Sequence, residues 1–324
     1  MVWFTNSIGL NPYIYANHLM KKFLFLLLLG ATSLCYGQDY VDLFVLNYGQ
    51  TSETDFEDGT GSTSRDILEA TLTIPIPINE NHAIITGLDF NQSNLEVSAA
   101  SGNVNLYSTT LQLGWSGTIN EKWSATVVML PKIASDYEQI DGDDFYFGGF
   151  GILKLKKREN FFYKFGAYAS SEAFGVFAVP IVGLYYLSPN EKFEANVSFP
   201  IAVNMNYKLG DRSKLGLDYV GIGRSFRLTT DGQKDTYIQQ GNLEFAAYYE
   251  YGLFNNTILL RLMAGYVTND FELYNENETY DLGLAAFRFG DDRTQLNADI
   301  DSGFYAKVGL RYRFYLNKDK EETP

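Results

Sequence analysis

The sequence predicts an all-β protein that crosses a membrane as a single antiparallel up-and-down β-barrel. The segment from Phe304 to Leu316 carries the clearest pattern, because every second residue is apolar while Lys307, Arg311 and Arg313 lie between apolar positions. Such alternation places the two sets on opposite faces of one strand. The segment is also longer than the about 9–11 residues that a strand needs to cross a bilayer. One face can meet lipid while the other, with three cations, faces a wet lumen.

The first 37 residues are expected to be absent from the folded protein. Met20-Lys21-Lys22 is a short basic start, Phe23–Leu29 is an apolar core, and a small residue, Gly37, precedes Gln38. This is the pattern of a secretory signal peptide, and its apolar core is too short for a membrane-spanning helix. Because residues 1–19 precede a complete signal and have no pattern, we expect Met20 to be the true start and cleavage to follow Gly37.

Composition and charge narrow the function classes. Removing 37 of the 324 residues leaves 287, and losing Lys21 and Lys22 changes the net charge from −14 to −16. A strongly acidic exported chain is a poor nucleic-acid binder. Cys35 is the only cysteine, so the mature chain has no disulfide, thiol nucleophile or thiolate metal ligand. The mean hydropathy is only −0.15, although 16% of the residues are aromatic. This combination suits a barrel, because its polar lumen-facing residues offset its apolar lipid-facing residues in the average.

The remaining strands follow from the same alternation. It recurs at membrane-crossing length in segments 68–78, 107–119, 161–169, 243–253 and 258–266, whereas strands of soluble proteins usually have about 5–6 residues. We count about twelve strands, with ten or fourteen as alternatives, because bacterial single-chain barrels have even numbers. The count is hardest around Phe199–Asn206. The barrel is expected to occupy residues 38–324 and to end in a short polar tail, 317–324.

The connections between strands are of two kinds, and charge follows them. Short turns lie at 79–81, 120–121, 158–159, 188–190, 210–212 and 255–256, and longer polar connections at 51–65, 99–103, 136–144, 229–235, 268–279 and 289–301. The longer connections are acidic, whereas the short-turn side carries cations, among them Lys122, Lys154, Lys156, Lys157 and Arg158. Because outer-membrane barrels have short periplasmic turns and longer extracellular loops, we expect the acidic loops outside the cell.

A repeated unit supports a resemblance to a known family. Glu121-Lys122-Trp123 and Glu191-Lys192-Phe193 each begin a strand that runs to a proline, at Pro131 and Pro200, and Leu209–Leu217 is a further shared segment. With these features the chain resembles uncharacterised outer-membrane β-barrel proteins of Gram-negative bacteria, classed by a domain of unknown function. The resemblance implies a barrel fold and an outer-membrane location, but no catalytic or binding residues. Many barrels end on an aromatic residue used in assembly, whereas here the polar tail follows Leu316.

The alternation predicts which charged side chains face the lumen. They are Lys164, Asp218, Glu244, Glu250, Arg261, Lys307, Arg311 and Arg313. Inward charges of both signs can line a selective pore or form an ion-pair network that fills a narrow barrel. We expect Arg261, Lys307, Arg311 and Arg313 to line any passage for anions, with the structural network as the alternative.

No residue pattern predicts catalysis, a cofactor or a metal site. His82 is the single histidine of the mature chain and lies in a tight turn, where a Ser/His or Asp/His pair at the outer rim is not expected. The segments Asp141–Asp144 and Asn275–Glu278 offer oxygen ligands without the spacing of an EF-hand loop, so we interpret them as solvated acidic loops. Aromatic residues near strand ends predict an interfacial girdle: Tyr40, Trp123, Phe161, Phe193 and Tyr266.

These observations favour a non-enzymatic channel or passive transporter for small polar solutes. A structural or surface-interaction barrel with a closed, ion-pair-filled lumen is the alternative, and a lipid-modifying enzyme is a weaker one. The partners expected are outer-membrane lipid, lipopolysaccharide and the barrel-assembly machinery. The sequence specifies neither the solute nor the oligomeric state.

Overall fold

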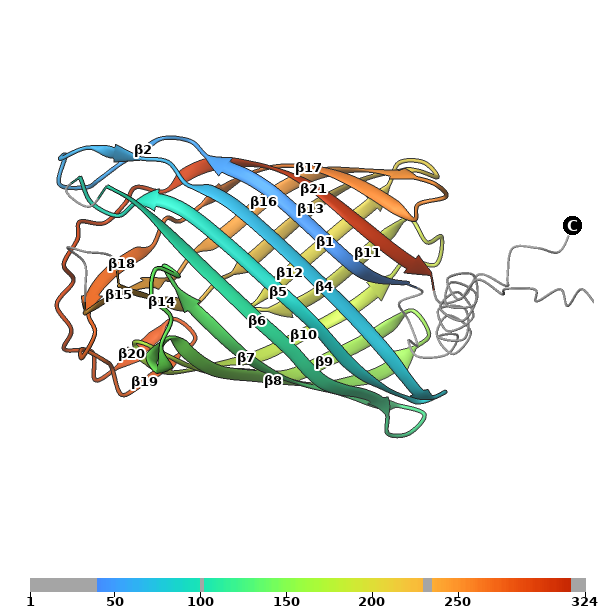
Figure 1. The fold of residues 1–324 in the computed structure, drawn as a ribbon. Coiled ribbons are helices and arrows are strands. Elements are labelled where there is room, and N and C mark those ends of the chain that lie inside the picture. The colour runs from blue at the N-terminus through green and yellow to red at the C-terminus, as the bar shows by residue number, and fades with distance from the viewer. Residues whose placement is uncertain (1–39, 100–101, 230–234, 316–324) are drawn as a thin grey trace, which may run out of the picture.

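The computed structural model describes residues 40–99, 102–229 and 235–315 (Figure 1). The expected signal peptide, the start at Met20, the cleavage after Gly37 and the polar tail 317–324 lie outside the described residues.

The described residues form a closed antiparallel barrel of fourteen strands. Each strand pairs with its two neighbours, and β21 closes the barrel on β1, with Tyr40 opposite Tyr315. The strands are β1 (Tyr40–Thr51), β4 (Asp66–Asn79), β5 (His82–Glu96), β6 (Asn103–Thr118), β7 (Trp123–Ser135), β8 (Phe145–Arg158), β9 (Phe161–Glu172), β10 (Gly175–Leu187), β11 (Phe193–Phe199), β12 (Ala202–Lys208), β13 (Ser213–Gly221), β16 (Leu243–Leu253), β17 (Ile258–Val267) and β21 (Gly303–Tyr315). The all-β barrel class is confirmed.

The estimate of about twelve strands is wrong, and fourteen was the upper alternative. The physical reason lies in the region around Phe199–Asn206, where β11 and β12 have seven residues each and only Pro200 and Ile201 between them. Both strands are shorter than the about 9–11 residues of a membrane-crossing strand. Length and alternation therefore do not identify them as two separate strands.

The shortness of β11 leaves the upper half of β10 without its expected neighbour. Pairing between β10 and β11 starts at Val182, opposite Phe199. Nearer the loop end, β10 instead pairs in parallel with β19 (Leu282–Leu284), which forms a hairpin with β20 (Phe287–Phe289). A loop segment thus contributes to the wall where β11 does not reach.

Residues alternate between the two faces of the wall as the strand pattern requires. In β16, Glu244, Ala246, Tyr248 and Glu250 are buried, whereas the odd-numbered residues from Leu243 to Tyr251 are exposed. The exposed set is apolar and lies on the outside, where a membrane barrel meets lipid. The buried set points into the lumen.

The connections at the loop end carry ordered structure of their own, and the one between β13 and β16 is longer than the predicted connection 229–235. They contain β2 (Thr54–Asp55), β3 (Ser62–Thr63), the 3-10 helix η1 (Gly142–Asp144), β14 (Arg224–Leu228), β15 (Thr236–Gln240) and β18 (Phe271–Asn275). β14, β15 and β18 form a small antiparallel sheet, which we call the insert. Figure 1 shows the insert at the end of the barrel that carries the long loops. In the described residues, no helix is long and apolar enough to span a membrane.

Candidate functional site in the barrel lumen

The insert closes the loop end of the lumen with a hydrophobic core. Phe226, Leu228, Ile238 and Phe271 of the insert are at most 2% exposed. They pack in one cluster with residues of β5 to β8 and of neighbouring loop segments: Phe56, Leu95, Val97, Val104, Leu106, Ala134, Tyr146 and Ile300. The inner face of the wall is therefore apolar at this end, and burial of these side chains holds the insert in the mouth.

Polar contacts attach the insert at a second side. The side chain of Glu172, at the end of β9, accepts hydrogen bonds from the backbone N–H and the hydroxyl of Ser225, each at 2.9 Å. Lys132 Nζ lies 2.5 Å from the other oxygen of the same carboxylate. In the described residues, β14 of the insert pairs with β7 of the wall through one parallel bridge, Arg227 with Ser135, and backbone hydrogen bonds from Ile222 to Asn242 and from Gly241 to Asp270 join the insert to the strands it continues from.

Arg227 joins the insert to two acidic loop segments. Its guanidinium lies 2.7 Å from Asp141 Oδ1 and 2.7 Å from Glu276 Oε1, and 3.8 Å from Asp144. The hydrogen bond from Arg227 holds the pKa of the Asp141 carboxyl below its usual range, and the same bond raises the pKa of Arg227. The two segments interpreted as solvated acidic loops thus converge on one arginine, while Asp143, Asn275 and Asn277 remain exposed to solvent. Among the described residues, no cluster of three or more potential ligands has the arrangement of a metal site.

A second arginine is held among aromatic rings of the loops. Arg293 lies over the rings of Tyr274 and Tyr280, at 3.9 and 4.8 Å from their centroids. It donates hydrogen bonds to Asp291 at 2.7 Å and to the hydroxyl of Tyr237 at 2.9 Å. Cation–π contacts and charge-assisted bonds together fix this part of the loop against the insert.

Below the insert, charged side chains of the lumen are paired. Lys307 Nζ lies 2.6 Å from Glu244 and 3.3 Å from Glu69, and Arg65 lies 2.9 Å from the second oxygen of Glu244. Glu244 and Lys307 are each 5% exposed. Arg65 and Lys307 carry two positive charges, and Glu244 and Glu69 carry two negative ones. These four side chains therefore form an ion-pair network whose charges balance.

A second network forms around Arg261. Its guanidinium donates to Glu250 at 2.6 and 3.0 Å, lies 3.5 Å from Asp218, and stacks over the ring of Tyr248 at 3.7 Å. The hydroxyl of Tyr248 donates to Asn204 Oδ1 at 3.1 Å. The network links β12, β13, β16 and β17 along the inner wall.

At the short-turn end, side chains cross the lumen. Arg313 donates to Asp42 at 2.6 and 3.0 Å, and its guanidinium lies 3.6 Å above the ring of Tyr40. Tyr40, on β1, donates to Glu194, on β11, at 3.0 Å. Because β1 and β11 are not neighbours in the wall, this bond bridges the lumen and narrows it.

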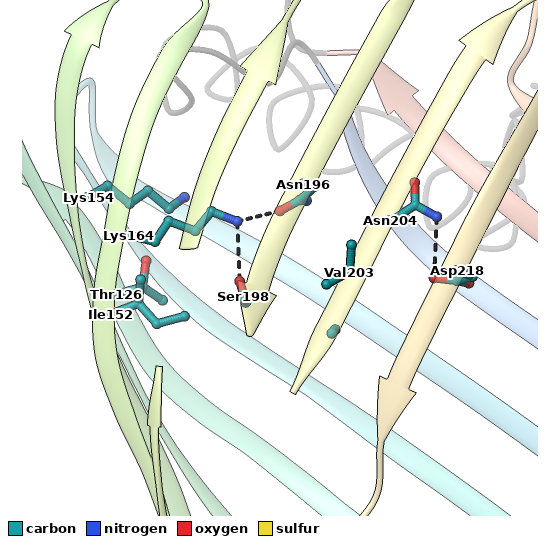
Figure 2. A pocket seen from close by; sticks show the side chains of 10 residues that line it. Thr126, Ile152, Lys154, Lys164, Asn196, Ser198, Val203, Asn204 and Asp218 are labelled. Carbon is teal, nitrogen blue, oxygen red and sulfur yellow. Dashed lines mark hydrogen bonds between the residues drawn. The ribbon is translucent and has the colours of Figure 1, made fainter. Parts of the chain in front are cut away.

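Between these networks lies a chamber of about 330 Å³. Its lining comes from six strands, β7 to β9 and β11 to β13: Thr126, Ile152, Lys154, Lys164, Asn196, Ser198, Ala202, Val203, Asn204 and Asp218. Figure 2 shows Lys154 and Lys164 side by side on one wall, with Asn204 and Asp218 across from them. Lys164 donates to Asn196 Oδ1 and to Ser198 Oγ, the latter at 3.3 Å.

A glycine allows Lys164 to reach Asn196 and Ser198. Lys164 lies on β9, its bonding partners lie on β11, and Gly183 of β10 lies between them in register. A Cβ on Gly183 would come within 2.0 Å of the Val197 carbonyl oxygen. The close approach of β10 and β11 therefore requires glycine, and the missing side chain leaves room above it for the lysine.

The structure places the eight charged residues expected in the lumen on the inner face. Glu244 and Lys307 meet in one network, and Asp218, Glu250 and Arg261 in another; Arg311 lies 3.4 Å from Asp42, beside Arg313. Lys164 belongs to the chamber. Whether any of them lines a passage stays a prediction.

Several residues of these networks were not identified from the sequence. Arg65, Asp42 and Glu194 complete ion pairs and lie at or near strand ends. Glu69 also completes one, and it lies in the alternating segment 68–78, on the face opposite the apolar residues. Lys154 was grouped with the basic short-turn side, although it shares the inward parity of Ile152. That parity was the signal that could have placed it in the lumen.

Two other expectations have specific outcomes. Tyr40 is not part of an aromatic girdle, because its hydroxyl binds Glu194 inside the barrel. His82 begins β5 and stacks on Trp115, with ring centroids 5.5 Å apart.

The fold and the lumen together define a class: a closed fourteen-stranded β-barrel with loop segments folded into its mouth. The chain belongs to the family described as "Domain of unknown function (DUF6268)", whose profile matches residues 45–313. This membership confirms the resemblance inferred from the sequence. The comparison with curated proteins finds no match.

Several solved structures align with most of this chain at low sequence identity and with TM-scores below 0.5. The COG4313 outer membrane channel from Pseudomonas putida F1 is 11% identical, with 86% of this chain and 98% of that chain covered and a TM-score of 0.44. The NanC porin is 8% identical, with coverage of 83% and 98% and a TM-score of 0.38. The Pseudomonas putida toluene transporter TodX is 10% identical, with coverage of 84% and 90% and a TM-score of 0.37.

Proposed function

We propose that this protein is a gated, non-enzymatic outer-membrane channel for small polar solutes. The observation that carries the proposal is the chamber, a partly open space of about 330 Å³ on the inner wall, where seven of the ten lining side chains are polar or charged. A polar space of this size holds water, and a water-filled lumen is what the passage of a polar solute requires. The apolar exterior supports insertion in a bilayer.

The insert is the gate in this proposal. The insert continues from β13, β16 and β17 through short junctions such as Gly241–Asn242, and it is joined to β7 by one main-chain bridge and to β9 by side-chain contacts. A bend at these junctions can shift the insert while the fourteen barrel strands stay paired. In the conformation described here the mouth is closed by the insert, and the short-turn end is narrowed by the Tyr40–Glu194 bond. A channel of this kind conducts only when the insert moves.

A reversible cross-link tests the gate. The hydroxyl of Ser225 accepts a hydrogen bond from the backbone N–H of Ala173 at 2.8 Å, which places the two residues close enough for an engineered disulfide. The described residues include no cysteine, so an Ala173→Cys/Ser225→Cys protein would form no competing disulfide. In a planar bilayer we expect single-channel steps in the reduced protein and far fewer after oxidation.

The matched controls are the two single-cysteine proteins, whose conductance should not respond to oxidation. Equal conductance of the double variant in both redox states would reject the insert as the gate. An absence of steps from folded protein in either state would reject the channel itself.

The second candidate function is a structural or surface-interaction barrel with a closed lumen. The observation that favours it is the pairing of Arg261, Lys307 and Arg313 with buried carboxylates. Under this candidate, folded protein gives no conductance with or without the cross-link.

A further inference from the structure

The chamber differs from the rest of the lumen in its charge balance. Arg261, Lys307 and Arg313 each have a carboxylate within 4.0 Å. For Lys154 and Lys164, no carboxylate of the described residues lies within that distance. The two lysines are direct register partners on β8 and β9, and both line the chamber.

Such an arrangement is unfavourable for a barrel without a ligand. Like charges directly opposite each other on neighbouring strands destabilise a sheet, and a buried charge needs a partner of opposite sign. Lys164 is only 8% exposed. Its bonds to Asn196 and Ser198 satisfy its donors but supply no negative charge. Burial and the neighbouring Lys154 thus disfavour the charged form of Lys164, and an anion placed between the two lysines would stabilise the charged form of both.

The facing side of the chamber has a different character. Asp218 is already compensated by Arg261 at 3.5 Å and accepts a hydrogen bond from Asn204 at 3.4 Å. A ligand therefore needs no positive charge in order to bind beside Asp218. Its remaining acceptor capacity, together with the side chains of Asn204 and Thr126, suits the hydroxyl groups of a solute.

We propose that the chamber binds a small hydroxylated carboxylate, of the size of a sugar acid, with its carboxylate between Lys154 and Lys164. The volume of about 330 Å³ lies at the small end of the range of ligand pockets, about 300–1,000 Å³. The apolar lining of Ile152, Ala202 and Val203 is confined to part of the wall, which suits the carbon chain of such a molecule. This inference names the solute class of the proposed channel and rests on it.

Direct binding tests the inference independently of conductance. The purified full barrel in detergent micelles is titrated by calorimetry with gluconate and with sorbitol, which share a hydroxylated six-carbon chain but differ in the carboxylate. We expect gluconate to bind and sorbitol to bind at least about tenfold more weakly, because a charge-assisted hydrogen bond contributes more than the difference that a factor of ten requires.

Two variants locate the site. Lys154→Gln and Lys164→Gln each remove one charge and keep a side chain of similar length, and each should weaken gluconate binding by about tenfold or more. Lys157→Gln is the matched control, since Lys157 lies on the same strand with an exposed side chain, and its affinity should equal that of the unmodified protein. Circular dichroism checks that each variant is folded.

The outcomes separate the inference from the proposed function. Equal affinity for gluconate and sorbitol, or unchanged gluconate affinity in both chamber variants, overturns the carboxylate site even if the protein conducts. Gluconate binding that both variants weaken supports the site even if no conductance is found, and the channel proposal then fails alone.

Discussion

Replacing Arg261 by methionine should destabilise the barrel strongly, because it leaves a buried carboxylate without its cation. Arg261 and Glu250 side chains are each 3% exposed, and two hydrogen bonds of 2.6 and 3.0 Å join them. Removing one partner of such a buried pair costs about 3–5 kcal/mol. Lys164→Met is the matched comparison, since the described residues place no carboxylate within 4.0 Å of this lysine. We therefore expect Lys164→Met to change stability by less than about 1 kcal/mol or to stabilise the protein.

Urea unfolding in lipid vesicles measures both effects, with Trp115 and Trp123 as fluorescent probes and linear extrapolation of the free energy of unfolding. An Arg261→Met/Glu250→Leu double variant should recover most of the lost stability, because the remaining charge is removed with its partner. A loss below about 1 kcal/mol for Arg261→Met would refute the view that these ion pairs are compensated structural elements. An equal loss for Lys164→Met would refute the distinction between the network and the chamber.

Three further predictions concern the wall, the insert and the narrow end. Gly183→Ala should destabilise the barrel by about 1–3 kcal/mol in the same assay, since the new Cβ meets the Val197 carbonyl; an unchanged midpoint would contradict this. Burial, with Glu272 nearby, raises the pKa of Asp270 to about 6, so the folded loop binds a proton more tightly than the unfolded loop. Protection of residues 268–275 from hydrogen exchange should therefore fall as pH rises from about 4 to 6, and Asp270→Asn should lose this dependence. Tyr40→Phe removes the bond to Glu194 across the lumen and should raise the conductance of open channels while leaving the fold intact; unchanged conductance would show that this bond does not limit the passage.

The sequence predicted the barrel because its information is local. Alternation in segments such as 243–253 and 304–316 identifies each strand and its inward face without reference to any neighbour. The partner of an inward charge depends on strand order and register, which alternation does not specify. The bond between Tyr40 and Glu194 joins residues 154 positions apart, and no spacing rule relates them. Lys154 shows a third limit. Its place in the alternation of the strand indicates that it faces the lumen, but the sequence does not show whether a carboxylate lies beside it.

The insert was not predicted from the sequence, for a related reason. Its three strands have five residues each, and segments of that length between polar stretches look like loop. Apolar residues at inward positions near the loop end, such as Val104 and Leu106, conflict with a water-filled lumen and were the available signal. When the inward-facing residues of a strand change from polar to apolar along its length, another segment of the chain is expected to pack against the apolar ones.

The contacts of the insert also determine how the gate can open. Complete expulsion would expose Phe226, Leu228, Ile238 and Phe271 to water, at roughly 1.5–3 kcal/mol per side chain, or roughly 6–12 kcal/mol together. That is comparable with the whole stability of a typical domain, about 5–15 kcal/mol, so expulsion is too costly for spontaneous opening. On the β9 side fewer groups hold the insert, namely the Ser225–Glu172 hydrogen bonds and a smaller aromatic cluster that contains Tyr237 and Tyr274 of the insert. Opening should therefore keep the larger apolar cluster with β5 to β8 and release the smaller set of contacts at the end of β9, where Ser225 binds Glu172 and where Tyr237 and Tyr274 pack against Phe174. This movement opens the side of the lumen beside β9 and β10, and the cross-link between Ala173 and Ser225 prevents it.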